Sequence, residues 1–136
     1  MRVSFITLSV SDVKQSQAFY KAFLQLEPVR VGTDHVFFNL EGTVLALFGA
    51  QAMAQETGAP SPGGGSVALS WNVDAEPDVQ DALQRALQAG GTQRRSPHRK
   101  PWGALAAWIA DPDGHPWEVV CNPGLPRRPD GGVDLR

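Results

Sequence analysis

The stretch DPDGHPWEVV, residues 111–120, is the part of the sequence that decides the fold. Its first four residues have turn chemistry, because proline presets φ and glycine accepts positive φ. The residues after the turn predict a strand over 115–121, with Glu118 between Trp117 and Val119. A carboxylate inside an apolar strand either faces water or has a partner, so the face that Glu118 occupies bears directly on function.

The composition is that of a globular chain with one domain. Its 136 residues are 42% hydrophobic and carry a formal net charge of −2, which fits a domain with its own core. No basic face is visible, so no nucleic-acid partner is expected, and the apolar runs are too short to predict a membrane span. The first residues have no signal-peptide pattern and Cys121 is the only cysteine, which favours a cytoplasmic protein without an internal disulfide.

Outward from this stretch, the chain divides into two halves with the same order of elements. Alternation and helical spacing in the first half predict a strand over 3–10, a helix over 12–26, and strands over 34–40 and 43–48. Glu41-Gly42 between these last strands is a hairpin signal. The second half predicts a strand over 67–73, a helix over 76–91, a short strand over 92–95, and strands over 104–110 and 115–121. Although only three strands are assigned individually in the first half, both halves are interpreted as βαβββ, which indicates an internal duplication.

Two further segments contain many proline and glycine residues. Residues 49–65 predict a linker with one helical turn near its start. Residues 123–136 predict a poorly ordered tail. The predicted organisation is one domain with a first module over 3–48, the linker, a second module over 66–122, and the tail.

Three stretches resemble the vicinal-oxygen-chelate superfamily, which includes glyoxalase I, bleomycin-resistance proteins and extradiol dioxygenases. They are ITLSVSDVKQSQAFYKAFLQL (6–26), VALSWNV (67–73) and WIADPDGHPWEVVCNP (108–123). The resemblance implies an α+β fold of two βαβββ modules, whose strands form a half-open cup with helices on the outer face. In the metalloenzymes of the superfamily, the cup holds one divalent metal, bound by residues of the first and fourth strands of each module. The resemblance also implies a homodimer with the cup near or across the interface.

Strict alternation along each strand assigns the side chains to the cup or to the helix side. The resemblance places the four metal-ligand positions at Phe5, Ala46, Ala68 and Glu118. The cup-facing residues are then Phe5, Thr7, Ser9, Val44, Ala46, Phe48, Ala68, Ser70, Asn72, Pro116, Glu118 and Val120. A hairpin register that pairs Leu40 with Thr43 adds His35, Phe37 and Asn39. The opposite faces are almost purely apolar, as expected beneath helices.

The same reasoning at the DPDG turn places Ala107 and Ile109 on the cup side, beside Glu118 and Pro116. It also pairs Trp108 with Trp117, which predicts that both are core residues. A one-residue bulge at the turn would reverse these assignments.

The predicted ligand positions do not favour a metal, because a catalytic divalent site needs about three protein ligands and an open position. Only Glu118 can coordinate. As a metal ligand it would need unexpected partners such as His35. As a lone buried acid with no cation nearby, it would have a raised pKa and act as a catalytic acid or base, or as an acceptor for a ligand. As a structural carboxylate, it would bond to the backbone or to a hydroxyl such as Thr7 or Ser70.

The remaining aromatic and basic residues have both structural and functional interpretations. Trp102, in the loop KPWG, either covers the cup and stacks on a flat ligand or anchors the loop in the core. His98 lies in the predicted loop SPHRKPWG (96–103) and is interpreted as solvated. The charge run 94–100 is typical of a solvated loop, although it is also able to attract an anionic ligand. His115 is predicted to lie on the face opposite Glu118.

Three functional hypotheses follow. The first is a small-molecule-binding protein without a cofactor, resembling the bleomycin-resistance branch. Its predicted ligand-binding residues are Phe5, Thr7, His35, Phe37, Phe48, Ser70, Asn72, Trp102 and Glu118. The second is a metal-dependent glyoxalase-like lyase or dioxygenase, with one divalent ion and Glu118 as a ligand. The third is a structural or regulatory dimer without a substrate.

Overall fold

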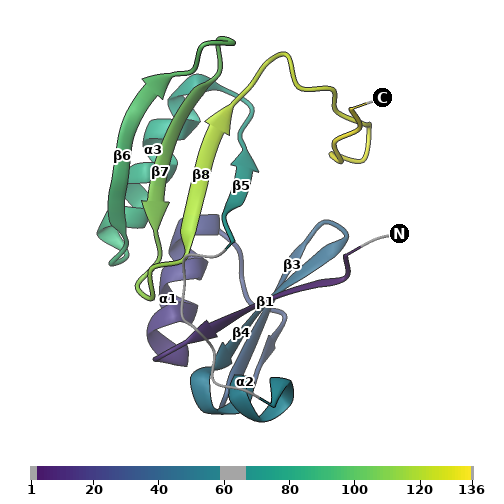
Figure 1. Ribbon diagram of the computed structural model, residues 1–136, viewed down its shortest axis with the longest axis vertical. Helices are drawn as coiled ribbons and strands as arrows, with labels where there is room; N and C mark the ends of the chain where they lie inside the picture. Colours follow the sequence, from purple (N-terminus) through teal and green to yellow (C-terminus); the bar gives the residue numbers. More distant parts are fainter. Residues whose placement is uncertain (1–2, 59–66, 136) are drawn as a thin grey trace.

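The computed structural model describes residues 3–58 and 67–135, which form two four-stranded sheets and three helices (Figure 1). The first module contains β1 (Phe5–Val10), α1 (Val13–Leu24), β2 (Arg30–Val31), β3 (His35–Leu40) and β4 (Thr43–Gly49). The second contains β5 (Leu69–Asn72), α3 (Glu76–Gln88), β6 (Thr92–Arg99), β7 (Leu105–Ala110) and β8 (Pro116–Cys121). Helix α2 (Ala50–Thr57) follows β4. The predicted α+β fold with two βαβββ modules is confirmed.

The two sheets have the same topology. The strand order is β1-β4-β3-β2 in the first sheet and β5-β8-β7-β6 in the second. In both, the first strand of the module pairs in parallel with the last, and the other pairs are antiparallel. Helices α1 and α3 pack against each other and against the sheets, so that one hydrophobic core spans both modules. Figure 1 shows the sheets diverging from this contact.

The start of the predicted linker and strand β6 differ from the sequence prediction. Helix α2 has two turns at the start of the predicted linker instead of one, and the rest of that linker, from residue 59, lies outside the described residues. Strand β6 continues to Arg99, so His98 lies in a strand and not in a loop. Two register shifts in the β6–β7 ladder accompany this extension. In the tail, Arg127 forms a bridge with Val133, and its guanidinium donates to Asp74 Oδ1 and to the carbonyl oxygen of Asn72.

The two hairpin turns set which side chains share a face. At Glu41-Gly42 both residues have positive φ, and the two-residue loop gives the predicted register, with Leu40 opposite Thr43. At the DPDG turn the register prediction is wrong by one residue. Gly114 adopts φ +89°, and the amide of Asp111 donates to the carbonyl of His115. The loop therefore has three residues, as in a type I turn followed by a left-handed residue.

This one-residue shift of register reverses the predicted faces of β7. Trp108 lies opposite Glu118 and Ile109 lies opposite Trp117. Ala107 and Ile109, predicted to face the cup, are fully buried in the core beneath the helices. Trp108, predicted to be a core residue, instead occupies the same face as Glu118 because paired residues on neighbouring strands project to the same side.

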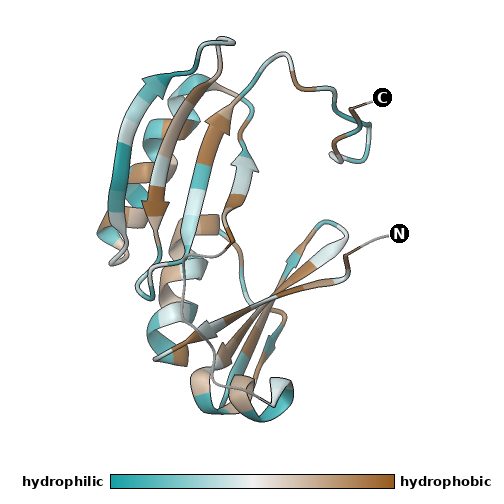
Figure 2. Ribbon diagram, in the orientation of Figure 1, coloured by the Kyte–Doolittle hydropathy of each residue, from teal (hydrophilic) through white to brown (hydrophobic). Residues whose placement is uncertain are grey.

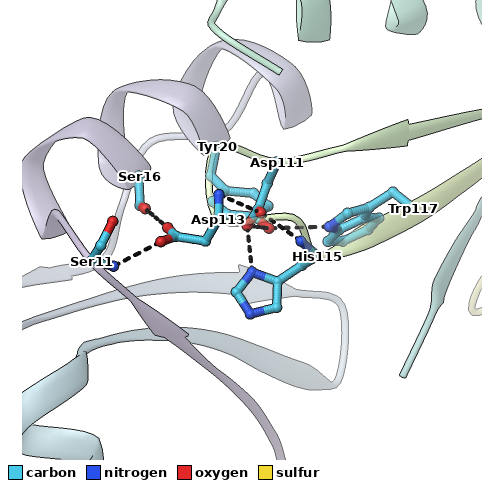
Figure 3. Close-up of polar contacts among 7 residues, drawn as sticks. All are labelled: Ser11, Ser16, Tyr20, Asp111, Asp113, His115 and Trp117. Carbon is cyan, nitrogen blue, oxygen red and sulfur yellow. Dashed lines mark hydrogen bonds and ion pairs between the residues drawn. The ribbon is translucent and has the colours of Figure 1, made fainter. Parts of the chain in front are cut away.

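A buried hydrogen-bond network joins the DPDG turn to the first module (Figure 3). The carboxylate of Asp111 accepts from the hydroxyl of Tyr20 at 2.7 Å and from the backbone amide of His115 at 2.8 Å. The His115 ring, through Nδ1, lies 2.8 Å from the same carboxylate. The indole of Trp117 donates to the Tyr20 hydroxyl. His115 therefore lies on the helix side, opposite Glu118, as predicted from the sequence.

A second carboxylate of the same turn holds the start of α1. Asp113 Oδ1 accepts from the backbone amide of Ser11 at 2.9 Å, and its Oδ2 accepts from the hydroxyl of Ser16 at 3.3 Å. These contacts join residues about a hundred positions apart in the chain. The turn that sets the register of β8 is therefore also a junction between the modules.

The network shifts the pKa values of its members. Burial alone would raise the pKa of Asp111, but the hydrogen bonds from His115 and Tyr20 outweigh it, so that this pKa lies below its ordinary value. The hydrogen bond to Asp111 raises the pKa of His115. Burial, reinforced by the negative charge of Asp111, raises the pKa of Tyr20 well above its ordinary value, so its hydroxyl keeps its proton.

Replacing His115 by glutamine is expected to flatten the pH dependence of stability above pH 6. The stabilising contribution of a raised histidine pKa is complete below about pH 6.5 and is lost as the pH rises through the folded-state pKa. The lowered pKa of Asp111 acts in the other direction, so its contribution is present above about pH 4 and is lost on acidification. Wild-type protein should lose on the order of 1 kcal/mol of unfolding free energy between about pH 6 and pH 8 in urea titrations. His115→Gln should lose much less.

Tyr20→Phe is the control for this measurement. It removes a donor to Asp111 and the acceptor of Trp117, which should lower stability by about 1–2 kcal/mol without changing the slope over the same pH interval. Parallel pH profiles for wild type and His115→Gln would contradict the assignment.

Candidate functional site

The concave face of the first sheet is predominantly aromatic. Phe37 packs edge-on against Phe5 with ring centroids 5.8 Å apart, and it stacks on Phe48 at 6.2 Å with an interplanar angle of 12°. The ring centroid of His35 lies 5.2 Å from that of Phe37. Phe5 remains 53% exposed. Thr7 and Ser9 lie on this side of β1 and are half-buried, so the face offers flat apolar contacts with few polar groups.

The concave face of the second sheet is a row of polar and aromatic side chains. The strand registers place Ser70 of β5 opposite Glu118 of β8, Glu118 opposite Trp108 of β7, and Trp108 opposite Arg95 of β6. A second row runs from Asn72 through Val120 and Ala106 to His98. The hydropathy colouring shows β6 as largely hydrophilic, in contrast to β4 (Figure 2). The second module therefore carries the charged half of the cup.

Glu118 has two partners on this face. Ser70 Oγ donates to Glu118 Oε2 at 2.9 Å, and Lys100 Nζ forms an ion pair with Glu118 Oε1. The side chains of Lys100 and Glu118 are 18% and 11% exposed. The expectation of a lone acid without a cation nearby is therefore wrong. Of the structural partners considered from the sequence, Ser70 is present.

Lys100 reaches Glu118 from the turn between β6 and β7. The amide of Lys100 donates to the carbonyl of Ala104, and the amide of Gly103 donates to the carbonyl of Lys100. Trp102, at the tip of this turn, is 67% exposed, and the Lys100 ammonium lies 5.2 Å from its ring centroid. Trp102 is therefore not anchored in the core, and its role as a cover for a flat ligand stays a prediction.

The residues present do not fit a divalent metal at the positions implied by the family resemblance. Phe5, Ala46 and Ala68 have no donor atoms, and the Glu118 carboxylate is already paired with an ammonium group. His35 lies on the other sheet with its Nδ1 2.8 Å from Asp34. Within residues 3–58 and 67–135, no group of three or more His, Cys, Asp or Glu side chains is arranged to hold a metal ion.

A cleft of about 670 Å³ lies between the modules. Ser70 and Asn72 line it, together with Trp71, Leu40 and Arg127, but Glu118 and Phe37 do not. The cleft therefore shares Ser70 and Asn72 with the concave face of the second sheet, whereas the parts of the two faces around Glu118 and Phe37 lie outside it. In the described part of the chain, the edge strands β1 and β5 do not pair, so the cup is not closed within one chain.

Sequence reasoning did not place Trp108 at the site, and it considered Arg95 and Lys100 only as members of the charge run 94–100, without a position on the concave face. The one signal for Lys100 was the need of a buried carboxylate for a counter-charge, combined with the basic run 94–100. Trp108 was misplaced because the three-residue loop at the DPDG turn pairs it with Glu118 and not with Trp117. The position of Arg95 depends on the register shifts in β6, for which the sequence carries no signal that we recognise.

Comparison with known proteins agrees with the fold. Residues 2–119 match the family model described as Glyoxalase/Bleomycin resistance protein/Dioxygenase superfamily. The crystal structure of a glyoxalase-related enzyme from Fulvimarina pelagi is similar over 99% of this chain and 98% of that chain, with 35% identity and a TM-score of 0.93. A family member from Burkholderia phytofirmans PsJN, described as a glyoxalase/bleomycin resistance protein/dioxygenase family enzyme, covers 89% of this chain and 98% of its own, with 16% identity and a TM-score of 0.78.

Matches below 25% identity, the Burkholderia structure included, add only the fold. Lactoylglutathione lyase from Agrobacterium tumefaciens aligns over 88% of this chain and 92% of its own, with 23% identity and a TM-score of 0.69. Among curated proteins, none matches the chain significantly. No helix in the described ranges has both the length and the apolar character needed to cross a membrane.

Lys100→Met is expected to destabilise the protein at neutral pH, because it leaves the largely buried carboxylate of Glu118 without its cation. Losing one partner of a fully buried pair costs about 3–5 kcal/mol. Since both side chains here keep some exposure, we expect about 1–3 kcal/mol at pH 7. Lys100→Met/Glu118→Gln, which removes both charges, should recover most of the stability in urea titrations. Equal losses in the single and double variants would show that the pair is not the cause.

Proposed function

Because the chain belongs to the Glyoxalase/Bleomycin resistance protein/Dioxygenase superfamily, we propose that it binds a small organic molecule between its concave faces, without a metal ion at the family positions. The first sheet contributes an aromatic surface around Phe37. The second sheet contributes sparse polar groups around Glu118. Such a combination of flat apolar contacts and a few oriented polar groups is typical of small-molecule sites.

The observation that carries this proposal is the partner of Glu118. At the one family position with a ligating side chain, the negative charge is compensated by the Lys100 ammonium and by the Ser70 hydroxyl. A divalent ion would have to displace the ammonium and would gain no second protein donor from Phe5, Ala46 or Ala68. The carboxylate is therefore better suited to holding Lys100 in place than to binding a cation from solution.

The proposal includes a homodimer in which a second copy closes the cup. Two apolar residues, Val3 before β1 and Val67 before β5, are 58% and 68% exposed. Phe5 on the concave face of β1 is also more than half exposed. Exposed apolar groups at corresponding edges of both modules support a contact between copies, and sedimentation analysis measures it directly.

A thermal-shift screen of small aromatic compounds tests the proposal with protein dialysed against a chelator. Ligands should raise the melting temperature to the same extent with and without added Mn²⁺, Ni²⁺ or Zn²⁺, because binding stabilises the folded state by mass action. Phe37→Ala should weaken binding about tenfold, since an aromatic contact is worth on the order of 1 kcal/mol beyond its area. Leu135→Ala, an exposed apolar residue in the tail, is the control and should leave binding unchanged.

Two results would overturn the proposal. One is a stoichiometric metal ion in elemental analysis that is lost in Glu118→Ala. The other is a set of ligand shifts that Phe37→Ala leaves intact.

A further inference from the structure

The second sheet carries a surplus of positive charge beside an aromatic ring. In the row Ser70–Glu118–Trp108–Arg95, together with the turn above it, the charged groups are Lys100, Arg95 and Glu118. Two cations and one anion leave one positive charge after the Lys100–Glu118 pair is counted. In the described part of the chain, Arg95 has no ion pair or hydrogen bond, and it is exposed.

Trp108 lies between the two cationic groups. Its strand neighbours are Glu118, which holds Lys100, on one side and Arg95 on the other. Neighbouring strands are about 4.8 Å apart, so the backbone positions of Glu118 and Arg95 are separated by about 10 Å. A ring resting on Trp108 would therefore have a cation near each edge. Trp102, mostly exposed and 5.2 Å from the Lys100 ammonium, adds a second aromatic surface at the rim.

The pairing of Lys100 with Glu118 leaves part of its hydrogen-bonding capacity unused. An ammonium group has three N–H donors, and among residues 3–58 and 67–135 the side chain of Lys100 has one oxygen acceptor, Glu118 Oε1. Arg95 provides a planar fork of donors that suits a carboxylate. The same two charges disfavour a cationic ligand at this place, since Glu118 is already compensated.

We propose that the concave face of the second module binds a planar organic anion, such as an aromatic carboxylate. Its acidic group lies beside Arg95, Lys100 adds positive charge at the opposite edge of the ring, and Trp108, with Trp102 at the rim, contacts the ring. This inference rests on the proposed function and narrows it to one class of ligand. In this arrangement Glu118 holds the Lys100 ammonium in place, and the positive charge of Lys100 attracts the anionic ligand.

A matched set of ligands separates charge from ring contact. Calorimetric titrations would compare 2-naphthoate, the neutral 2-naphthamide and the cationic 2-naphthylmethylammonium, which share one ring system. We expect naphthoate to bind at least tenfold more tightly than naphthamide, and the cation to bind most weakly. The advantage of naphthoate should fall as salt is raised, because exposed charges are screened.

Two substitutions on one strand locate the effect. Arg95→Gln should reduce naphthoate affinity about tenfold, as expected for losing a charge-assisted hydrogen bond, and should leave naphthamide affinity unchanged. Arg99→Gln is the matched control, because Arg99 is paired with Leu105 on the opposite face and contacts Glu76 of α3. Lys100→Met/Glu118→Gln removes the other cation without leaving an uncompensated carboxylate, and it should also reduce the preference for naphthoate.

The outcomes distinguish this inference from the proposed function. Equal affinity for naphthoate and naphthamide, or a naphthoate preference that survives Arg95→Gln and the double variant, would overturn the charge assignment while leaving small-molecule binding in place. Failure of all three compounds to bind, together with a negative aromatic thermal-shift screen, would overturn both.

Discussion

The carboxylate of Asp111 is the group on which the arrangement of the two modules depends. It is 2% exposed and accepts hydrogen bonds from Tyr20 of α1 and from both the backbone and the ring of His115. A buried carboxylate is stable only when donors replace its water, and here the donors come from both modules. The same residue closes the β7–β8 loop, so the contact between modules and the register of β8 are fixed together. That register places Glu118 and Trp108 on the concave face.

Glu118 lies on the face of β8 opposite this network. The two acidic groups are satisfied in different ways. Asp111 is held by neutral and titratable donors inside the core, whereas Glu118 is held at the edge of solvent by the ammonium of Lys100. The hydrogen bonds of Asp111 support the fold. The ion pair of Glu118 keeps the Lys100 ammonium on an open surface, where the surrounding groups are aromatic.

Much of this arrangement was predictable from the sequence, because it follows from local rules. The duplication, the helices and the faces of β1, β3 and β8 come from periodicity, and the β3–β4 register follows from the two-residue loop at Glu41-Gly42. The β7–β8 register was not predictable in this way, because the residues DPDG do not by themselves determine the length of the loop. Gly114, in the left-handed conformation, is the third loop residue. The contact between Lys100 and Glu118 was not predictable either, since it depends on the turn at residues 100–103 and on packing, and not on spacing in the sequence.

The two modules have kept one topology while their concave faces have become chemically different. Around Phe37 the first face is aromatic, and the guanidinium carbon of Arg30 lies 5.8 Å from the Phe37 ring centroid. Around Trp108 the second face carries Lys100, Glu118 and Arg95. Neither face alone surrounds a ligand, because each is an open sheet. In the proposed dimer, the two faces would combine a flat apolar wall with a charged one, and a duplicated fold permits this division of roles because each half has its own sheet.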